Sequence, residues 1–246
     1  QLRNVNTGHV NVGLPSGLAR LLTTDLVREF RQKLPGASLS LSGGLSASLL
    51  ESLLSGHIDI ALLYRPQPSP DVELLKLVEE ELFLVGPANE GMGTDPITLR
   101  EVAKLPLVIP RRPHEIRAVV ESAMAQVGKK PQVALEVDGV PAILDVLAGG
   151  GGYAILPVYA VAIYSKSEPF ALRRIVDPSV FSMVALATSS RPPATATQRT
   201  ALRIIEEMCR ERLVPAINER VRQFVDTLRL GPSEARAFDV LAVPTR

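Results

Sequence analysis

The 246-residue sequence holds a single cysteine, Cys209, and only three histidines. One cysteine excludes an intrachain disulfide framework and any metal site built of cysteines alone. Charges nearly balance, with 27 Lys and Arg against 26 Asp and Glu, so the whole chain has no net electrostatic attraction to nucleic acid. Hydrophobic residues make up 46% of the chain, which excludes a disordered tail and is enough for one large domain or two small ones.

Targeting and membrane signals are also missing. The first thirty residues contain no basic stretch followed by an apolar run, so we predict no signal peptide. Residues 146–164 form a charge-free run, but four glycines at 149–152 and Pro157 interrupt it. Such a run would leave backbone groups unsatisfied in lipid. We therefore predict a helix end, a turn, a buried strand and a further helix there, and no membrane partner.

The first third of the chain alternates strand and helix patterns. Alternating apolar residues predict a strand at 10–14, and apolar residues at helical spacing predict a helix over 18–30. A strand at 39–41, a helix at 46–54 and an apolar strand at 58–64 follow. Consecutive strands joined by helices require crossovers, so we predict a parallel, right-handed α/β unit.

A second set of similar patterns follows a proline-rich loop at 65–70. We expect strands at 81–85, 107–109, 133–137, 153–156, 172–175 and 180–188, and helices at 99–103, 116–127, 141–148 and 197–213. Residues 214–246 carry only a further weak helical pattern. The predicted fold class is therefore α/β, with two similar α/β units.

Catalytic and cofactor motifs are not found in the sequence. It has no HExxH, Walker A or GxSxG motif, and its histidines lie far apart. The glycines at 149–152 follow a predicted helix rather than a strand, so we interpret them as a helix end and tight turn instead of a dinucleotide loop. Cys209 is interpreted as a packed thiol. We predict no catalytic constellation, no metal and no cofactor.

Two strand-to-helix junctions are candidates for a ligand site. Residues 14–17 and 43–47 each bring helix N–H groups and a serine, Ser16 or Ser46, to the carboxyl edge of the predicted sheet. Each serine alone would be expected to act as an N-cap, but two such junctions side by side favour a small anion or carboxylate. Tyr64 ends the third strand at the same edge and could close the pocket wall.

A charged cluster follows the predicted strand at 107–109. Its members are Arg111, Arg112, His114, Glu115 and Arg117. These residues either place charge opposite the two junctions or form a solvated loop and helix start, and the sequence alone leaves both open.

The order and spacing of several segments resemble one family. These segments are Gly8-His9-Val10-Asn11-Val12-Gly13, Gly44-Leu45-Ser46, Gly56-His57-Ile58-Asp59-Ile60-Ala61, Pro106-Leu107-Val108-Ile109 and Gly150-Gly151-Gly152-Tyr153-Ala154-Ile155-Leu156-Pro157. Over residues 8–213 the chain resembles the effector-binding (regulatory) domain of LysR-type transcriptional regulators, a bacterial family.

The resemblance implies a periplasmic-binding-protein-like fold of two Rossmann-like subdomains joined by two crossover strands. Subdomain I would comprise residues 8–80 and 188–213, and subdomain II residues 81–187. Residues 1–7 would be the tail of a linker, and residues 214–246 a C-terminal extension. The DNA-binding winged helix-turn-helix of the family is not in the sequence, so we expect DNA to be bound only through a missing N-terminal domain.

The resemblance also implies ligand contacts in a cleft. By position they fall on Pro15, Ser16, Gly17, Ser46, Ala47, Tyr64, His114 and Glu115. Ala47 and Tyr64 stand where the family often has threonine, which favours a bulkier or less polar inducer over a sulfate-like one.

The resemblance further implies a small-molecule switch in the cytoplasm, a homodimer through the regulatory domains and a tetramer at full length. The helices at 18–30 and 116–127 are the expected dimer faces. The alternatives are a periplasmic-type solute-binding protein and a two-lobed α/β enzyme. A signal peptide upstream of the sequence would favour the former, and catalytic groups converging in a cleft would favour the latter.

Overall fold

The computed structural model describes residues 7–88, 92–93, 95–164, 170–191, 194–227 and 241–242. The chain divides into two compact units. Unit 1 comprises Gln1–Val78, Met183–Ala216 and Ala242–Arg246, and unit 2 comprises Glu79–Ser182 and Ile217–Leu241. The chain passes between the units within β4 (Val72–Pro87), within β10 (Val180–Ser189) and again at Ala216–Ile217, within α8 (Val214–Thr227). Of the predicted linker tail, residues 1–6 lie outside the described residues.

Unit 1 is built on the predicted strand–helix alternation. Its elements are β1 (Gly8–Pro15), α1 (Ser16–Lys33), β2 (Ala37–Gly44), α2 (Ser46–Leu54) and β3 (Ile60–Tyr64). β1 pairs in parallel with both β2 and β3, as predicted. β10 pairs with β3 in antiparallel orientation and so extends the predicted parallel unit into a mixed sheet. β10 returns from unit 2 without a crossover helix, and it therefore enters the sheet in the opposite direction.

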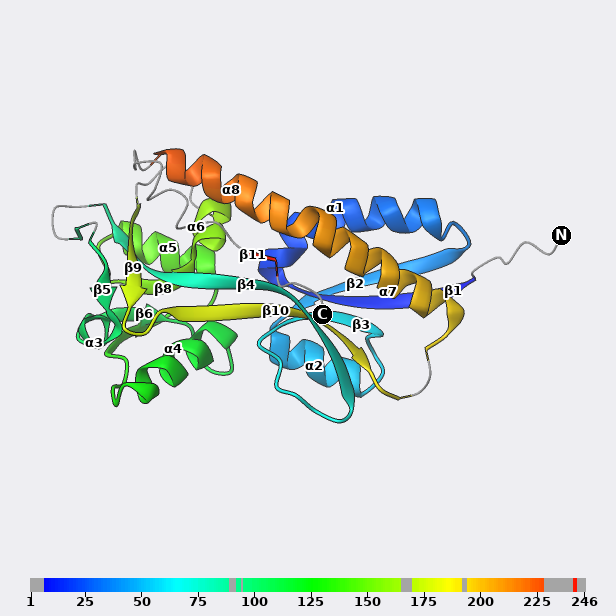
Figure 1. Cartoon of the computed structure of the whole chain (residues 1–246), viewed down its shortest axis with the longest axis horizontal. Coiled ribbons are helices and arrows are strands. Elements are labelled where there is room, and N and C mark those ends of the chain that lie inside the picture. Colours follow the sequence, from blue (N-terminus) through cyan, green and yellow to red (C-terminus); the bar gives the residue numbers. More distant parts are fainter. Residues whose placement is uncertain are drawn as a thin grey trace. The chain divides into compact units, whose positions relative to one another are not determined.

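Helices cover both faces of the unit 1 sheet. α1 and α7 (Ala196–Met208) lie on one side of the strands and α2 lies on the other (Figure 1). α1 buries Leu18, Leu22, Leu26 and Phe30, which repeat every four residues along one face of the helix. This one-sided burial makes the helix amphipathic and fixes which face it turns to the sheet.

Unit 2 is a second α/β unit with a mixed sheet. Its remaining elements are β5 (Ile97–Thr98), α3 (Leu99–Val102), β6 (Leu107–Ile109), α4 (Glu115–Gln126), β7 (Val133–Glu136), α5 (Val140–Ala148), β8 (Ala154–Pro157), α6 (Val158–Tyr164) and β9 (Phe170–Val176). β4 pairs in antiparallel orientation with β8 and β9, whereas β6 and β7 are parallel. A core cluster that includes Leu82, Leu84, Val120 and Ile155 holds the strands and α4 together.

The predicted single helix at 197–213 is divided. α7 ends at Met208, and one π-helical turn, Cys209–Leu213, leads into α8 (Val214–Thr227). Pro215 lies at the start of α8 and has no backbone N–H to donate into the preceding turn. The π-helical turn accommodates the ring of Pro215, so the chain stays helical from α7 into α8. Within the described part of the chain no helix is both long and apolar enough to cross a membrane.

Candidate ligand-binding site

The carboxyl edge of the unit 1 sheet brings the two predicted junctions together. β1 and β2 pair so that Pro15 is the Cα partner of Gly44, and each strand leads directly into a helix. β3 runs parallel to β1 and ends at the same edge with Tyr64. We call this region the anion edge and define it by Pro15, Ser16, Gly17, Ser46, Ala47 and Tyr64.

The serines do not cap their helices, which corrects the sequence prediction. Pro15 and Leu45 are the N-cap residues, both in extended conformation, and neither helix start has a side-chain cap hydrogen bond. Ser16 and Ser46 are instead the first residues inside their helices. Because neither N-cap side chain pairs with the first-turn N–H groups, these groups lack the capping acceptor that a serine, threonine or aspartate cap would supply.

The two serines also differ from each other. Ser46 is buried, and its Oγ accepts a hydrogen bond of 3.0 Å from the backbone N–H of Tyr64. This bond fastens the start of α2 to the end of β3. Ser16 is exposed at the start of α1. The Ser16 hydroxyl is therefore open to solvent, whereas the Ser46 hydroxyl is engaged within the fold.

His114 and Glu115 lie in unit 2, at the start of α4. His114 is the N-cap, and its Nδ1 accepts a hydrogen bond of 3.2 Å from the backbone N–H of Ile116. The Glu115 carboxylate lies 3.6 Å from His114 Nδ1, and its Oε2 is buried with no hydrogen-bond partner among the described residues. The helix dipole favours an acidic group at this position.

The arginines of the charged cluster are already paired. Arg111 contacts Asp138, with Nε to Oδ2 at 2.8 Å, and this hydrogen bonding holds the pKa of Asp138 below its usual value. Arg112 and Arg117 both contact Glu121, at 2.9 and 2.7 Å. Because each of these arginines is paired with a carboxylate, the cluster does not offer an unpaired positive charge to a ligand, which was one of the two possibilities that the sequence left open.

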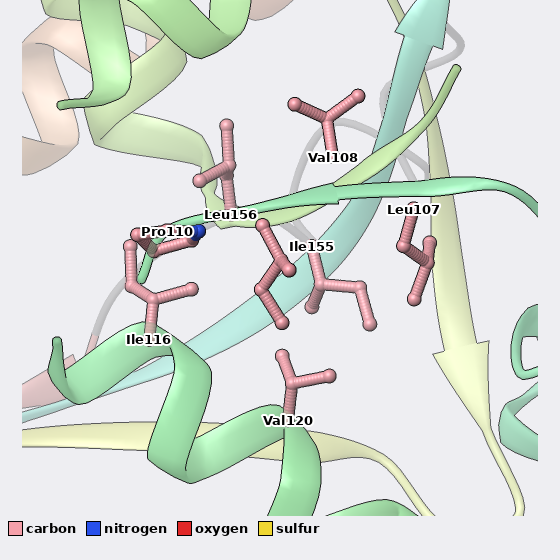
Figure 2. A pocket seen from close by; sticks show the side chains of 8 residues that line it. Leu107, Val108, Pro110, Ile116, Val120, Ile155 and Leu156 are labelled. Atoms are coloured by element: carbon pink, nitrogen blue, oxygen red, sulfur yellow. The ribbon is translucent and has the colours of Figure 1, made fainter. Parts of the chain in front are cut away.

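A small gap in unit 2 lies between α4 and the ends of β6 and β8. Figure 2 shows Ile116 pointing from α4 toward Pro110, and Val120 pointing from the same helix toward Ile155. The gap has a volume of about 10 Å³, and all its lining residues are apolar. That volume is about one water molecule, so the gap is a packing defect and not a ligand pocket.

The remaining reactive side chains are engaged locally. Cys209 is buried, and burial together with the nearby Glu206 carboxylate raises the pKa of its thiol to about 12. It therefore stays a packed thiol at neutral pH, as predicted. His9 contacts Ser38 Oγ at 2.7 Å, and His57 contacts Ser55 Oγ at 2.8 Å. Both histidines are held by local hydrogen bonds near the surface of unit 1.

The sequence did not single out two other features. Glu80 on β4 is a buried carboxyl group, and a hollow beside the proline-rich loop carries two cations. Glu80 lies in a run of three glutamates, a pattern that predicts an exposed side chain. The hollow is formed by two segments that lie more than a hundred residues apart in the sequence. Neither feature had a local signal in the sequence.

Two α/β units, one of them with two helix N-termini at the carboxyl edge of its sheet, form an arrangement that is typical of proteins that bind small molecules. The chain belongs to the family described as LysR substrate binding domain, which it matches over residues 3–210. It is the regulatory domain of a LysR-type transcriptional regulator, and several curated relatives that it matches are named as regulatory proteins. It is 27% identical over 224 residues to the nitrogen assimilation regulatory protein nac of Klebsiella aerogenes, covering 89% of this chain and 70% of that protein.

Solved structures confirm the predicted two-subdomain, periplasmic-binding-protein-like fold. The effector-binding domain of QuiR in complex with shikimate has a TM-score of 0.71 at 18% identity and covers 84% of this chain and 99% of that chain. The CcmR regulatory domain of Synechocystis PCC6803 in complex with 2-PG has a TM-score of 0.71 at 16% identity, with coverages of 83% and 99%. The chain spans 70% of nac but only 49% of a second curated regulator, that of Bordetella bronchiseptica.

Proposed function

We propose that this domain senses a small anionic effector, such as a carboxylate, and thereby controls DNA binding by a cytoplasmic transcriptional regulator. The observation that carries the proposal is the anion edge, where α1 and α2 begin side by side without side-chain caps. The N–H groups and dipoles of both helices favour negative charge there. The ligands named for similar domains, shikimate and 2-PG, fit this class.

The proposed contacts are Pro15, Ser16, Gly17, Ser46, Ala47 and Tyr64 in unit 1, and His114 and Glu115 in unit 2. Ser16 has the direct polar role because it is exposed, whereas Ser46 acts through the backbone of Tyr64. The effector shifts the conformational equilibrium of the domain only by its differential affinity for the two states. DNA itself would be bound by another part of the regulator.

The proposal predicts opposite effects of Ser16→Asp on stability and on binding. A carboxylate at the start of α1 interacts favourably with the helix dipole, so the ligand-free melting temperature stays unchanged or rises slightly. The same charge repels an anionic effector, and we expect its Kd to rise by about tenfold or more. Thermal-shift titrations with shikimate, 2-PG and other small carboxylates measure both quantities.

The matched control is Thr23→Asp, which adds the same charge at an exposed position farther along α1. It should leave the ligand-induced shift intact. If no carboxylate stabilises the wild-type domain, or if Ser16→Asp binds as well as wild type, the anion edge is not the effector site.

We also propose that the domain forms homodimers, and tetramers at full length. In unit 2 the edge strand β7 pairs with β6, and Val133 and Leu135 on it are 36% and 44% exposed. An exposed apolar edge strand favours association with another chain. The helices α1 and α4 remain predicted contributors to the same association.

Leu135→Glu tests this interface. A charge on the β7 edge should shift sedimentation from dimer to monomer, with at least a tenfold rise in the dissociation constant. Lys129→Glu, at an exposed position of the same unit, should leave the dimer intact. A dimer that tolerates Leu135→Glu would place the interface elsewhere.

A further inference from the structure

A surface hollow in unit 1 lies beside the proline-rich loop. It has a volume of about 440 Å³ and is lined by residues 65–69, by Val72, Leu74 and Lys76 of β4, and by Met183 and Ala185 of β10. We call it the lateral hollow. It shares no residue with the anion edge, and its volume lies in the range of small-molecule sites.

The floor of the lateral hollow is apolar. Val72 is buried, Ala185 is fully buried, and Leu74 and Met183 are half-buried. Val72 and Leu74 also pack in the cluster that α2 forms with β3, so the floor continues the core of unit 1. The apolar face of a flat ligand can therefore pack on this floor, because no polar side chain of the floor would lose its contact with water.

The rim of the hollow is positively charged. Arg65 and Lys76 are both exposed, and no residue of the lining is acidic. Neither side chain makes a hydrogen bond or ion pair with any described residue. This distinguishes them from the arginines at 111, 112, 117, 174 and 212, each of which contacts a carboxylate. The two rim cations are available to an anion from outside the chain.

The backbone at Arg65 is strained and held in place. Its φ is 42°, in the left-handed region, and within the described residues only Asp177 is also a non-glycine residue with positive φ. The Arg65 N–H donates a hydrogen bond of 2.8 Å to the carbonyl of Met183 on β10, which lines the same hollow. Residues in such conformations cluster at functional sites. Here the strain turns the chain so that the loop walls the hollow, and Pro66 and Pro68 stiffen that wall.

We propose that the lateral hollow is a second ligand site of this domain, for a flat apolar acid such as an aromatic carboxylate. The apolar floor would cover the ring, and Arg65 and Lys76 would pair with the carboxylate at the rim. The site is separate from the anion edge, and the proposal does not depend on the effector that binds there.

Fluorescence titration with 2-naphthoate tests the proposal. The chain has no tryptophan, so naphthalene emission can be followed without protein tryptophan background. We expect Lys76→Gln and Arg65→Gly each to weaken 2-naphthoate binding by about threefold to tenfold, and the double variant to weaken it further. Glycine at position 65 also relieves the positive φ, so misfolding does not explain the loss.

Three comparisons make the result decisive. Lys129→Gln, at an exposed lysine in unit 2, should bind like wild type, and the neutral 2-naphthamide should bind at least tenfold more weakly than the acid. Ser16→Asp should leave 2-naphthoate binding unchanged. The proposal is overturned if wild type does not bind 2-naphthoate at millimolar concentration, if the amide binds equally well, or if Ser16→Asp abolishes binding while Lys76→Gln does not.

Discussion

Replacing Glu80 with glutamine is expected to raise the melting temperature of this domain, by a margin that grows as the pH rises from 5 to 8. Glu80 lies on β4 and is only 2% exposed. Both of its carboxyl oxygens lack a hydrogen-bond partner among the described residues. Burial raises the pKa of this carboxyl from 4.5 to about 8, so the group is protonated in the folded domain at neutral pH.

The direction of the pH effect on stability follows from the protonation of Glu80 in the folded domain and in the unfolded chain. Between pH 4.5 and 8 the unfolded chain has lost this proton while the folded domain keeps it, so folding must take a proton up. Stability is therefore highest below pH 4.5 for this group and falls as the pH rises toward 8. At 1.36 kcal/mol per pH unit, the cost at pH 7 is about 3 kcal/mol. Glutamine cannot ionise, so it removes this cost.

Melting curves of wild type and Glu80→Gln at pH 5, 6, 7 and 8 measure the effect. The neighbouring Glu79→Gln is the matched control, because Glu79 is exposed. Its difference from wild type should stay small and independent of pH. Parallel pH profiles for wild type and Glu80→Gln would show that Glu80 keeps an ordinary pKa in the folded domain.

Replacing Gly152 with alanine is expected to destabilise unit 2 by about 3 kcal/mol. Gly152 has a φ of 132°, and a Cβ at this position would lie 2.6 Å from the carbonyl oxygen of Pro106. The close approach is needed because Tyr153 donates a hydrogen bond of 3.0 Å to the same carbonyl. The Val108 N–H then donates to the Tyr153 carbonyl at 2.7 Å, which aligns β6 with the start of β8. An added methyl group would force these strands apart.

Urea unfolding of Gly152→Ala measures the loss, and Gly150→Ala is the control. Gly150 also has a positive φ, of 78°, but a Cβ there would meet no atom within 4 Å. Gly150→Ala should therefore lose only the free energy that alanine costs in a left-handed backbone conformation, about 1 kcal/mol. If both variants lose the same free energy of unfolding, the close approach of residue 152 to the Pro106 carbonyl is not the reason that glycine is needed.

Local patterns predicted most of the fold. The apolar strand at 107–109 has the bounds of β6, and the glycines at 149–152 form the helix end and turn that their context indicated. The strand at 180–188 was predicted, but its antiparallel direction was not, because apolar alternation shows that a strand forms and not which way it runs. The early start of β4 at Val72 was missed because charged residues at 73, 76, 79, 80 and 81 mask its apolar face.

The sequence predicted that the two strand-to-helix junctions lie at one sheet edge, but not how Ser16 and Ser46 are placed there. A serine at the start of a helix has the same sequence signature whether it caps the helix or occupies its first turn. Only the three-dimensional structure shows Ser46 accepting from Tyr64, eighteen positions away. Asp59 accepts a hydrogen bond of 2.6 Å from Gln198, which is 139 positions away, and no local pattern reveals such a pair.

The path of the chain between the units governs the order in which they can form during synthesis. Neither unit is one continuous stretch, since unit 1 resumes at Met183 and unit 2 resumes at Ile217. The β1 to β3 region leaves the ribosome first, yet it waits for β10 and α7 to complete its sheet and cover it. The nascent chain must therefore protect an unfinished apolar surface for about a hundred residues of translation, the circumstance in which chaperones are needed.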